Sequence, residues 1–252
     1  MRRVIDAALA AFVVLGLGTQ TRAADDKDAN AIVEKAIKAL GGAEKLAKVK
    51  AFTTKGKGKI SFGDMENDFN IESTVQGLDH VRQVFEGEFN GNKFRGEMVL
   101  AGDKGFRDFG GMKMDFDKDA LANEMRTIYL QVIPALLLPL KDKEYKLEAA
   151  GEEKVGGKAA VGVKVTPPDK KDFTIYFDKE SGLPAKVVAK VVGFMGDEFV
   201  QETLYADFKD FDGVKKATKV ENHRDGKKFL EQQITEFKVL DKVDPKTFDV
   251  TK

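Results

Sequence analysis

Two stretches of the chain repeat hydrophobic residues at helical spacing. The first lies in "DANAIVEKAIKALGG", where one stripe is formed by Ile32, Val33, Ala36, Ile37 and Leu40. Apolar residues three and four apart share one face of an α-helix. Gly41 and Gly42 follow as a stop signal, because glycine readily adopts the left-handed conformation that ends helices. A shorter helical turn is expected to continue to about Lys50.

From there to Phe116 the pattern changes to alternation. "KGKGKISFG", "NDFNIESTV", "HVRQVFEGEFN" and "NKFRGEMVLAG" read as strands separated by turn residues, and "KGFRDFGGMKMDF" adds a short hairpin. Alternating apolar and polar residues are typical of half-buried strands. This spacing predicts an antiparallel meander.

A second helix interrupts the strands. From Lys118 the apolar residues at helical spacing are Leu121, Met125, Ile128, Tyr129, Val132, Ile133, Leu136 and Leu137. Asp117 is the expected N-cap. Pro134 should kink or end the helix, because it lacks an N–H and crowds the preceding turn, and Pro139 should block any continuation. "IPALLLPL" (133–140) is therefore expected to be a broken, apolar helix end.

Six further strands follow, in "KAAVGVKVTPP", "DFTIYFD", "LPAKVVAKVVGF", "EFVQETLYADFKDF", "VKKATKVENH" and "KFLEQQITEFKVL". No linker or low-complexity stretch divides residues 24–252, so one domain is expected. The fold class is mainly β (α+β), with roughly ten to twelve strands in one antiparallel sheet. A sheet this wide tends to curl, and the two helices can cover one of its faces.

Residues 1–23 have the pattern of a signal peptide. Arg2 and Arg3 precede the apolar run "AALAAFVVLGLG", and "TRA" suggests cleavage after Ala23. The alternative, a retained membrane anchor, needs about 20 apolar residues, and this run is shorter. We therefore expect a periplasmic or secreted protein. The chain has no cysteine, so neither a disulfide nor a lipid-modified cysteine is available.

The charge balance and the motif content exclude several classes of function. The chain has 42 basic and 42 acidic residues, so it lacks the basic excess of a general nucleic-acid binder. No motif of a hydrolase, a P-loop or a dinucleotide site occurs. His80 and His223 are expected at the surface. Acidic runs beginning at Asp26 and Asp115 lack the glycine and glutamate of a calcium loop. We expect no enzyme activity, no metal and no other cofactor.

Phenylalanine is the outstanding residue type, with 19 Phe and no Trp. Many of these residues alternate along strands, which is usual for one buried face of a sheet. Their number also suits a concave apolar cavity for a small molecule. The predicted cavity residues are Phe69, Ile71, Phe85, Phe89, Phe94, Met98, Leu100, Phe106 and Phe109. The predicted lid over them consists of Tyr129, Ile133, Leu136 and Leu137.

Several segments resemble the bacterial periplasmic lipoprotein-carrier (LolA-like) superfamily. These are "ALGGAEKLAKVKAF", "EKVGGKAAVGVKVTPPDKKDFTIYFDKESGLPAKV", "ADFKDFDGVKKATKVENHRDGK" and the C-terminal "VDPKTFDV". The resemblance covers most of the chain after the signal peptide. It implies a half-open antiparallel barrel closed by a helical lid, with an interior that holds acyl chains. It also implies an arginine inside the barrel that controls opening, for which Arg82, Arg95 and Arg107 are candidates.

Three hypotheses for function follow. The first is a secreted, non-enzymatic protein that binds or carries a lipid or an acylated protein in the cell envelope. The second is an envelope sensor or interaction module that docks a partner, possible partners including an envelope membrane protein, because this fold also serves stress sensors. The third is a hydrolase with an unrecognised site. The chain itself carries no predicted membrane span after residue 23.

Overall fold

The structure is a computed structural model that describes residues 21–62, 65–89, 91–193 and 196–251. Most of the predicted signal peptide lies outside this range, and α1 (Thr21–Leu40) includes the predicted cleavage position. The other helices are α2 (Ala43–Leu46), α3 (Lys118–Leu136) and two 3₁₀ turns, η1 (Leu138–Lys141) and η2 (Pro245–Phe248). Within the described residues, no helix has the length and apolar character that a membrane span requires.

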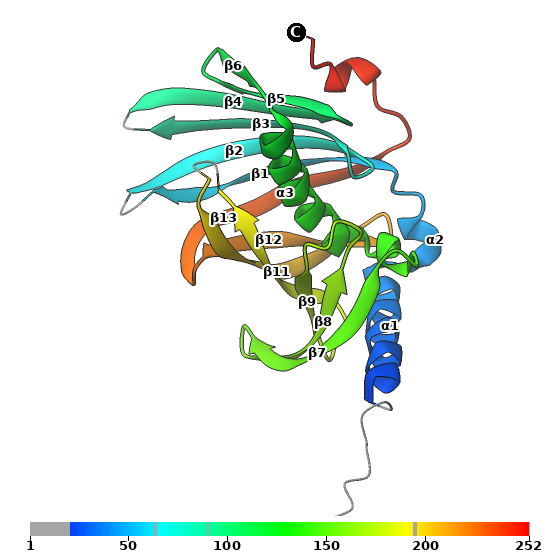
Figure 1. Ribbon diagram of the computed structural model, residues 1–252. Coiled ribbons are helices and arrows are strands. Elements are labelled where there is room, and N and C mark those ends of the chain that lie inside the picture. Colours follow the sequence, from blue (N-terminus) through cyan, green and yellow to red (C-terminus); the bar gives the residue numbers. More distant parts are fainter. Residues whose placement is uncertain (1–20, 63–64, 90, 194–195, 252) are drawn as a thin grey trace, which may run out of the picture.

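Thirteen strands form one antiparallel sheet that does not close on itself. They are β1 (Ala51–Phe62), β2 (Met65–Gln76), β3 (His80–Phe89), β4 (Asn92–Ala101), β5 (Lys104–Phe109), β6 (Met112–Asp115), β7 (Lys146–Val155), β8 (Lys158–Thr166), β9 (Phe173–Asp178), β10 (Pro184–Val192), β11 (Glu198–Phe211), β12 (Val214–Arg224) and β13 (Lys227–Leu240). The sheet curls, and α3 lies on its hollow side (Figure 1). The predicted half-open barrel with helical covers is confirmed.

The strand order explains why α3 lies where it does. The sheet consists of two meanders, β1–β6 and β7–β13, which meet where β1 pairs with β13. This arrangement places β6 and β7 at the two opposite edges of the sheet. The segment between them, which contains α3 and η1, must therefore cross the whole hollow face. The central helix covers the sheet as a direct result of this topology.

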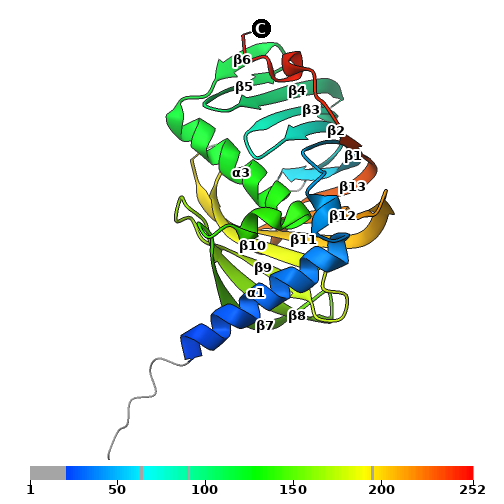
Figure 2. The same cartoon turned by 90° about the vertical axis from the view of Figure 1, so that its right-hand side faces the viewer.

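The first helix covers the other end of the same face. Its buried residues follow the predicted stripe and include Val33, Ile37 and Leu40, each no more than 2% exposed. Figure 2 shows α1 running across the β7–β8 end of the sheet. The helix ends at Gly41 and Gly42, which have φ of 134° and 89°. Both stop signals therefore have the predicted role.

The second helix starts as predicted and ends two residues later than Pro134. The Asp117 carboxylate accepts hydrogen bonds from the backbone N–H groups of Asp119 and Ala120, at 3.0 and 2.8 Å. The helix continues to Leu136, and the N–H of Leu137 donates to the carbonyl of Ile133 at 2.8 Å. Leu137 has a φ of 60° and closes the helix. Pro134 thus lies in the last turn of α3, where its missing N–H removes one hydrogen bond and the helix ends two residues later.

The sequence pattern missed strand β7. Its sequence, "KLEAAGEEKV", contains three glutamates and a central glycine, and such residues are depleted in strands. Gly151 has a φ of 78°, at the irregularity in the β7–β8 pairing. As an edge strand, β7 is held by its pairing with β8 and by α1 on its inner side. The other predicted strands are present, and Pro184 begins β10 after the Gly182 turn as expected from the "GLP" sequence.

Candidate functional site: an aromatic row on the inner face

The side chains of β1–β5 divide into two faces, which the strand register identifies. Val81 and Leu100 are direct cross-strand partners, and both pack in the core with Ile133 of α3. Residues that alternate with them share this inner face, because successive side chains of a strand point to opposite sides. By this register the inner face includes Phe69, Ile71, Phe85, Phe94, Met98, Leu100 and Phe109.

Four of these phenylalanines form a continuous row across β2, β3, β4 and β5. The ring centroids of Phe69 and Phe85 are 4.9 Å apart, those of Phe85 and Phe94 are 6.1 Å apart, and those of Phe94 and Phe109 are 5.7 Å apart. Phe69 is buried, and the other three are half-buried. Figure 1 shows β2–β4 extending beyond α3. We call these four residues the aromatic row.

Two inner-face glycines leave room for this row. Gly87 is the cross-strand partner of both Phe69 and Phe94, and Gly96 is the partner of both Phe85 and Phe109. A side chain at Gly96 would come within 3.2 Å of the Phe109 ring. The rings therefore lie over glycines of the neighbouring strands, and they stack diagonally across the sheet.

Beyond Phe109 the row reaches an open edge of the sheet. Met112 of the edge strand β6 is the cross-strand partner of Phe109, and Met114 is the partner of Arg107. These methionines are 72% and 44% exposed. The two methionines alternate along β6 on the inner face, and methionine adapts to many apolar partners. The apolar inner surface is thus accessible from the β6 edge.

The inclusion of Phe106 among the inner residues is wrong. Phe106 is opposite Val99, and both point to the outer face. There they form a separate small core with Phe248 of η2, Val243 and Val250. Phe106 and Phe109 are three residues apart on one strand, so they must face opposite sides. Phe89 ends β3, and its side chain lies outside the described residues.

The predicted lid covers the inner face as a packed part of the core. Ile133 and Leu137 are fully buried, whereas Tyr129 and Leu136 are half-buried. They pack with residues from both meanders, including Val75, Val163 and Phe173. The two prolines place Leu137 and Leu140 inward, since η1 follows the helix end directly. In this structure the apolar segment 133–140 is core that joins the two halves of the sheet.

Arg107 connects the aromatic row to the cover helix. Its guanidinium Nη2 forms an ion pair with the Glu124 Oε1 of α3, and the two side chains are only 15% and 20% exposed. The Arg107 Cζ also lies 5.4 Å from the Phe109 ring centroid and 5.5 Å from that of Phe116. Breaking this ion pair would leave two partly buried charges without each other as partners, which is costly. The contact therefore holds the start of α3 over β5.

The other two candidate arginines face away from the helix. Arg82 and Arg95 alternate with the inner residues and form ion pairs with Glu97 and Glu86 on the outer face, at 2.7 and 3.4 Å. Of the three arginines, only Arg107 lies on the inner face and contacts α3.

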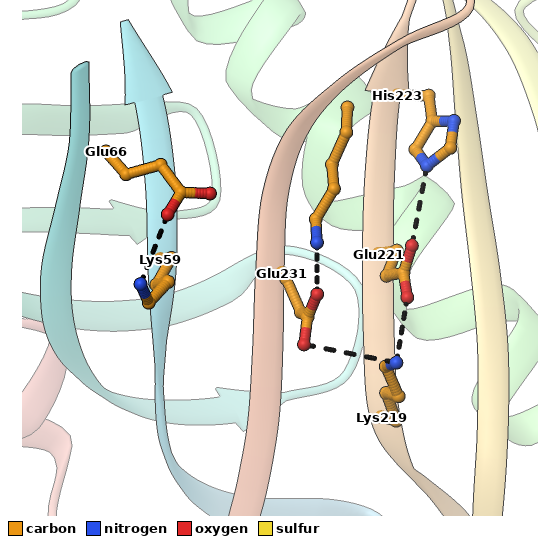
Figure 3. A network of polar contacts seen from close by, with 7 residues as sticks. Lys59, Glu66, Lys219, Glu221, His223 and Glu231 are labelled. Atoms are coloured by element: carbon orange, nitrogen blue, oxygen red, sulfur yellow. Dashed lines mark hydrogen bonds and ion pairs between the residues drawn. The ribbon is translucent and has the colours of Figure 1, made fainter. Parts of the chain in front are cut away.

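Alternating charges cover the outer face. In the network of Figure 3, Lys59 pairs with Glu66 at 3.1 Å, and Lys219 bridges Glu221 and Glu231 at 3.0 and 3.9 Å. His223 lies 3.5 Å from Glu221. A shallow groove of about 980 Å³ on this face is lined mainly by such residues from β1 to β4 and β13. Exposed pairs of this kind add little to stability, and their balanced charge suits a solvated surface.

Both histidines lie on the outer face, away from the aromatic row. His80 Nδ1 lies 2.8 Å from the Asp79 carboxylate, and its ring packs edge-on against Phe248. His223 belongs to the outer-face network. Their side chains are 37% and 24% exposed, so both lie at the surface as expected. Among the residues that the structure describes, no group of three or more His, Asp or Glu side chains is arranged to hold a metal ion.

Comparison with known proteins identifies the fold. No family model and no curated protein matches the sequence. A LolA superfamily protein from Nitrosomonas europaea aligns with a TM-score of 0.56 at 11% identity, covering 88% of this chain and 97% of that chain. A DUF1329 family protein from Desulfovibrio piger aligns with a TM-score of 0.54 at 12% identity, covering 88% and 98%.

A third structure, a putative outer membrane lipoprotein-sorting protein domain from Vibrio parahaemolyticus, has a TM-score of 0.50 at 11% identity, covering 86% of this chain and 97% of that chain. At such low identity these alignments establish the fold and leave the function open. The chain therefore has the LolA-like fold that the resemblance in its sequence implied.

Proposed function

We propose that this protein binds the acyl chains of a lipid or an acylated protein on the inner face of β2–β5 and carries them within the cell envelope. The aromatic row is the observation that supports this proposal. It is a continuous apolar row in which Phe69 is buried and the other three rings are half-buried, and it lies on the hollow side of the sheet and leads to an open edge. Such surfaces are rare on monomeric soluble proteins unless they bind something.

Binding would depend mainly on the hydrophobic effect. Each methylene removed from water contributes about 0.8 kcal/mol, so a long chain lying along the row could bind tightly with few hydrogen bonds. Entry from the β6 edge would bring the chain past Met112 and Met114. The Arg107–Glu124 pair lies between the aromatic row and the part of the inner face that α3 covers. Opening this pair would extend the apolar surface toward Met98 and Leu100.

Two measurements test this function. Mass spectrometry of organic extracts from the purified protein should detect lipid, and a fluorescent fatty-acid probe should bind saturably. The probe should be displaced by unlabelled fatty acid. A protein that carries no lipid and binds no probe would contradict the proposal. That result would favour the partner-docking alternative, for which the exposed edge strand β6 offers a surface.

A further inference from the structure

A second hollow, of about 450 Å³, lies on the other side of α3, between the helix, the β8–β9 loop and the facing ends of β10 and β11. Its polar lining includes Asn123 and Arg126 of α3 and Lys170, Lys171 and Asp172 of the loop. Glu124, which pairs with Arg107, and Arg126 are two residues apart, so their side chains point to nearly opposite sides of the helix, about 160° apart. The hollow is therefore separate from the aromatic row.

Arg126 is buried beside this hollow without a carboxylate partner. Its residue is only 7% exposed. One nitrogen, Nη2, donates to the backbone carbonyl of Asp172 at 3.0 Å, and Cζ lies 5.4 Å from the Phe173 ring centroid. Nε and Nη1 have no hydrogen-bond partner among the described residues. Arginine is rarely buried unless it is paired, because an unpaired buried charge is costly.

The carboxylates of the hollow are already paired with lysines. Asp172 lies 2.7 Å from the Lys164 Nζ, and Glu198 lies 2.5 Å from the Lys190 Nζ. Burial lowers the pKa of Arg126, and the nearby charges of Asp169 and Asp172 only partly offset this effect. The guanidinium is therefore not neutralised by a direct carboxylate contact within the described part of the chain.

Two more cations stand at the rim. Lys170 and Lys171 form no ion pair within the described residues, and they lie on a well-defined turn. The N–H of Lys170 donates to the Pro167 carbonyl at 2.9 Å, and the N–H of Lys171 donates to the Asp169 carboxylate at 3.0 Å. The turn fixes the backbone of both lysines next to Arg126. Their long side chains remain free to reach an anion.

We propose that Arg126, Lys170 and Lys171 form a binding site for a phosphate group. The ammonium groups of Lys170 and Lys171 can donate to phosphate oxygens from the rim, and the Arg126 guanidinium adds a positive charge in the wall of the hollow. The Asn123 amide lines the same hollow and can donate to a third oxygen. The Arg126 Nε and Nη1 are themselves closed off from solvent, so the buried guanidinium would attract a phosphate in the hollow through its positive charge. The hollow suits one small headgroup, because pockets of this size hold small ligands.

The site does not depend on the acyl-chain proposal, and it can be tested separately. Isothermal titration would measure the binding of inorganic phosphate and of dihexanoyl phosphatidic acid to the folded protein. Arg126→Gln should weaken both by about tenfold or more, the effect of losing a buried positive charge next to the bound anion. Because Arg126 is buried, the double variant Lys170→Gln/Lys171→Gln provides a second test on exposed residues. It should weaken binding by about threefold or more and remain folded by circular dichroism.

Arg95→Gln, on the outer face of β4, is the matched control and should leave phosphate binding unchanged. Comparable affinity for the two ligands would identify the free anion as sufficient, and stronger binding of the phosphatidic acid would identify a lipid headgroup. Both results support the site. Absence of saturable binding of either ligand, or unchanged binding in the folded double-lysine variant, would overturn it. Phosphate binding with no fatty-acid probe binding would refute the acyl-chain proposal alone.

Discussion

Arg107 of β5 forms an ion pair with Glu124 of α3, and the arginine also lies against the rings of Phe109 and Phe116. One side chain thus contacts both the end of the aromatic row and the helix that crosses the sheet. The two residues are 17 positions apart in the sequence. Their ion pair lies at the boundary between the exposed part of the inner face and the part that α3 covers.

Arg107→Gln should loosen the start of α3. We expect a loss of about 1–2 kcal/mol in the free energy of unfolding, because a partly buried charge loses its partner. The association rate of a fluorescent fatty-acid probe should rise, since less of the inner face is closed. Glu124→Gln should have the same effect, and the double variant should add little to either. Stopped-flow fluorescence and urea unfolding provide these measurements, and strictly additive effects would show that the two residues act separately.

Phe85→Ala and Phe94→Ala should weaken probe binding, because each removes a half-exposed ring from the aromatic row. We expect about a tenfold loss of affinity for each, from roughly 1–2 kcal/mol of lost apolar contact. The matched control is Phe106→Ala, which removes the same ring from the outer face. It should lower the free energy of unfolding by about 3 kcal/mol and leave the affinity of the folded protein unchanged. Equal losses of affinity in all three variants would rule out the row as the binding surface.

Leu137→Glu should unfold the protein or lower its free energy of unfolding by several kcal/mol. The side chain is fully buried, so the substitution places a carboxylate in the core without a partner. Ala122→Glu on the exposed side of α3 serves as control and should change the melting temperature little. A Leu137→Glu protein that melts like the parent would show that the segment 133–140 leaves the core easily and acts as a mobile lid.

Lys216 gives the protein a pH-dependent stability. Its ammonium lies 5.8 and 6.0 Å from the ring centroids of Phe52 and Phe237, and burial lowers its pKa to about 8. The unfolded chain keeps this proton up to a pH of about 10.4. Between pH 8 and 10.4 the unfolded state binds more protons, so the contribution of Lys216 to stability rises with pH.

Below pH 8 both the folded and the unfolded states hold the proton. Burial of the charged Lys216 ammonium then lowers the free energy of unfolding by its full amount, about 1–3 kcal/mol for a lysine that still reaches water. Lys216→Met should remove this slope, which urea unfolding at pH 7 to 10 would measure. The difference between parent and variant is the relevant quantity, because tyrosines and other lysines titrate in the same range. Parallel stability curves for the two proteins would show that Lys216 is solvated.

Much of the fold could be predicted because local patterns agree with the final structure. The stripe ending at Leu40, the Asp117 cap and the Gly182 turn each depend on neighbours in sequence, and all three are present as predicted. Strand β7 could not be predicted in this way. Its glutamates favour no strand by themselves, and only pairing with β8 and contact with α1 hold it extended.

The candidate site was harder to predict, because it depends on which face a residue occupies. Phe106 and Phe109 look equivalent in the sequence, yet strand alternation sends them to opposite faces. A strict count of register from Leu100 through the β4–β5 turn would have separated them. Nothing local to Arg126 indicated its burial, because its unpaired guanidinium results from the packing of α3 against a loop about 46 residues later.

The pairing of β1 with β13 has a consequence for how the protein acquires its structure. Each meander forms through contacts between neighbours in sequence, but the seam between them joins Ala51 to Leu240. Such a distant contact is slow to form, because the intervening chain must first lose much of its freedom. Until β13 is available, the edge of β1 is unpaired, and the two meanders against which α3 packs are not joined. The chain must therefore be synthesised through β13 before the two halves of the sheet can join, and in that interval an unpaired β1 is exposed to other chains.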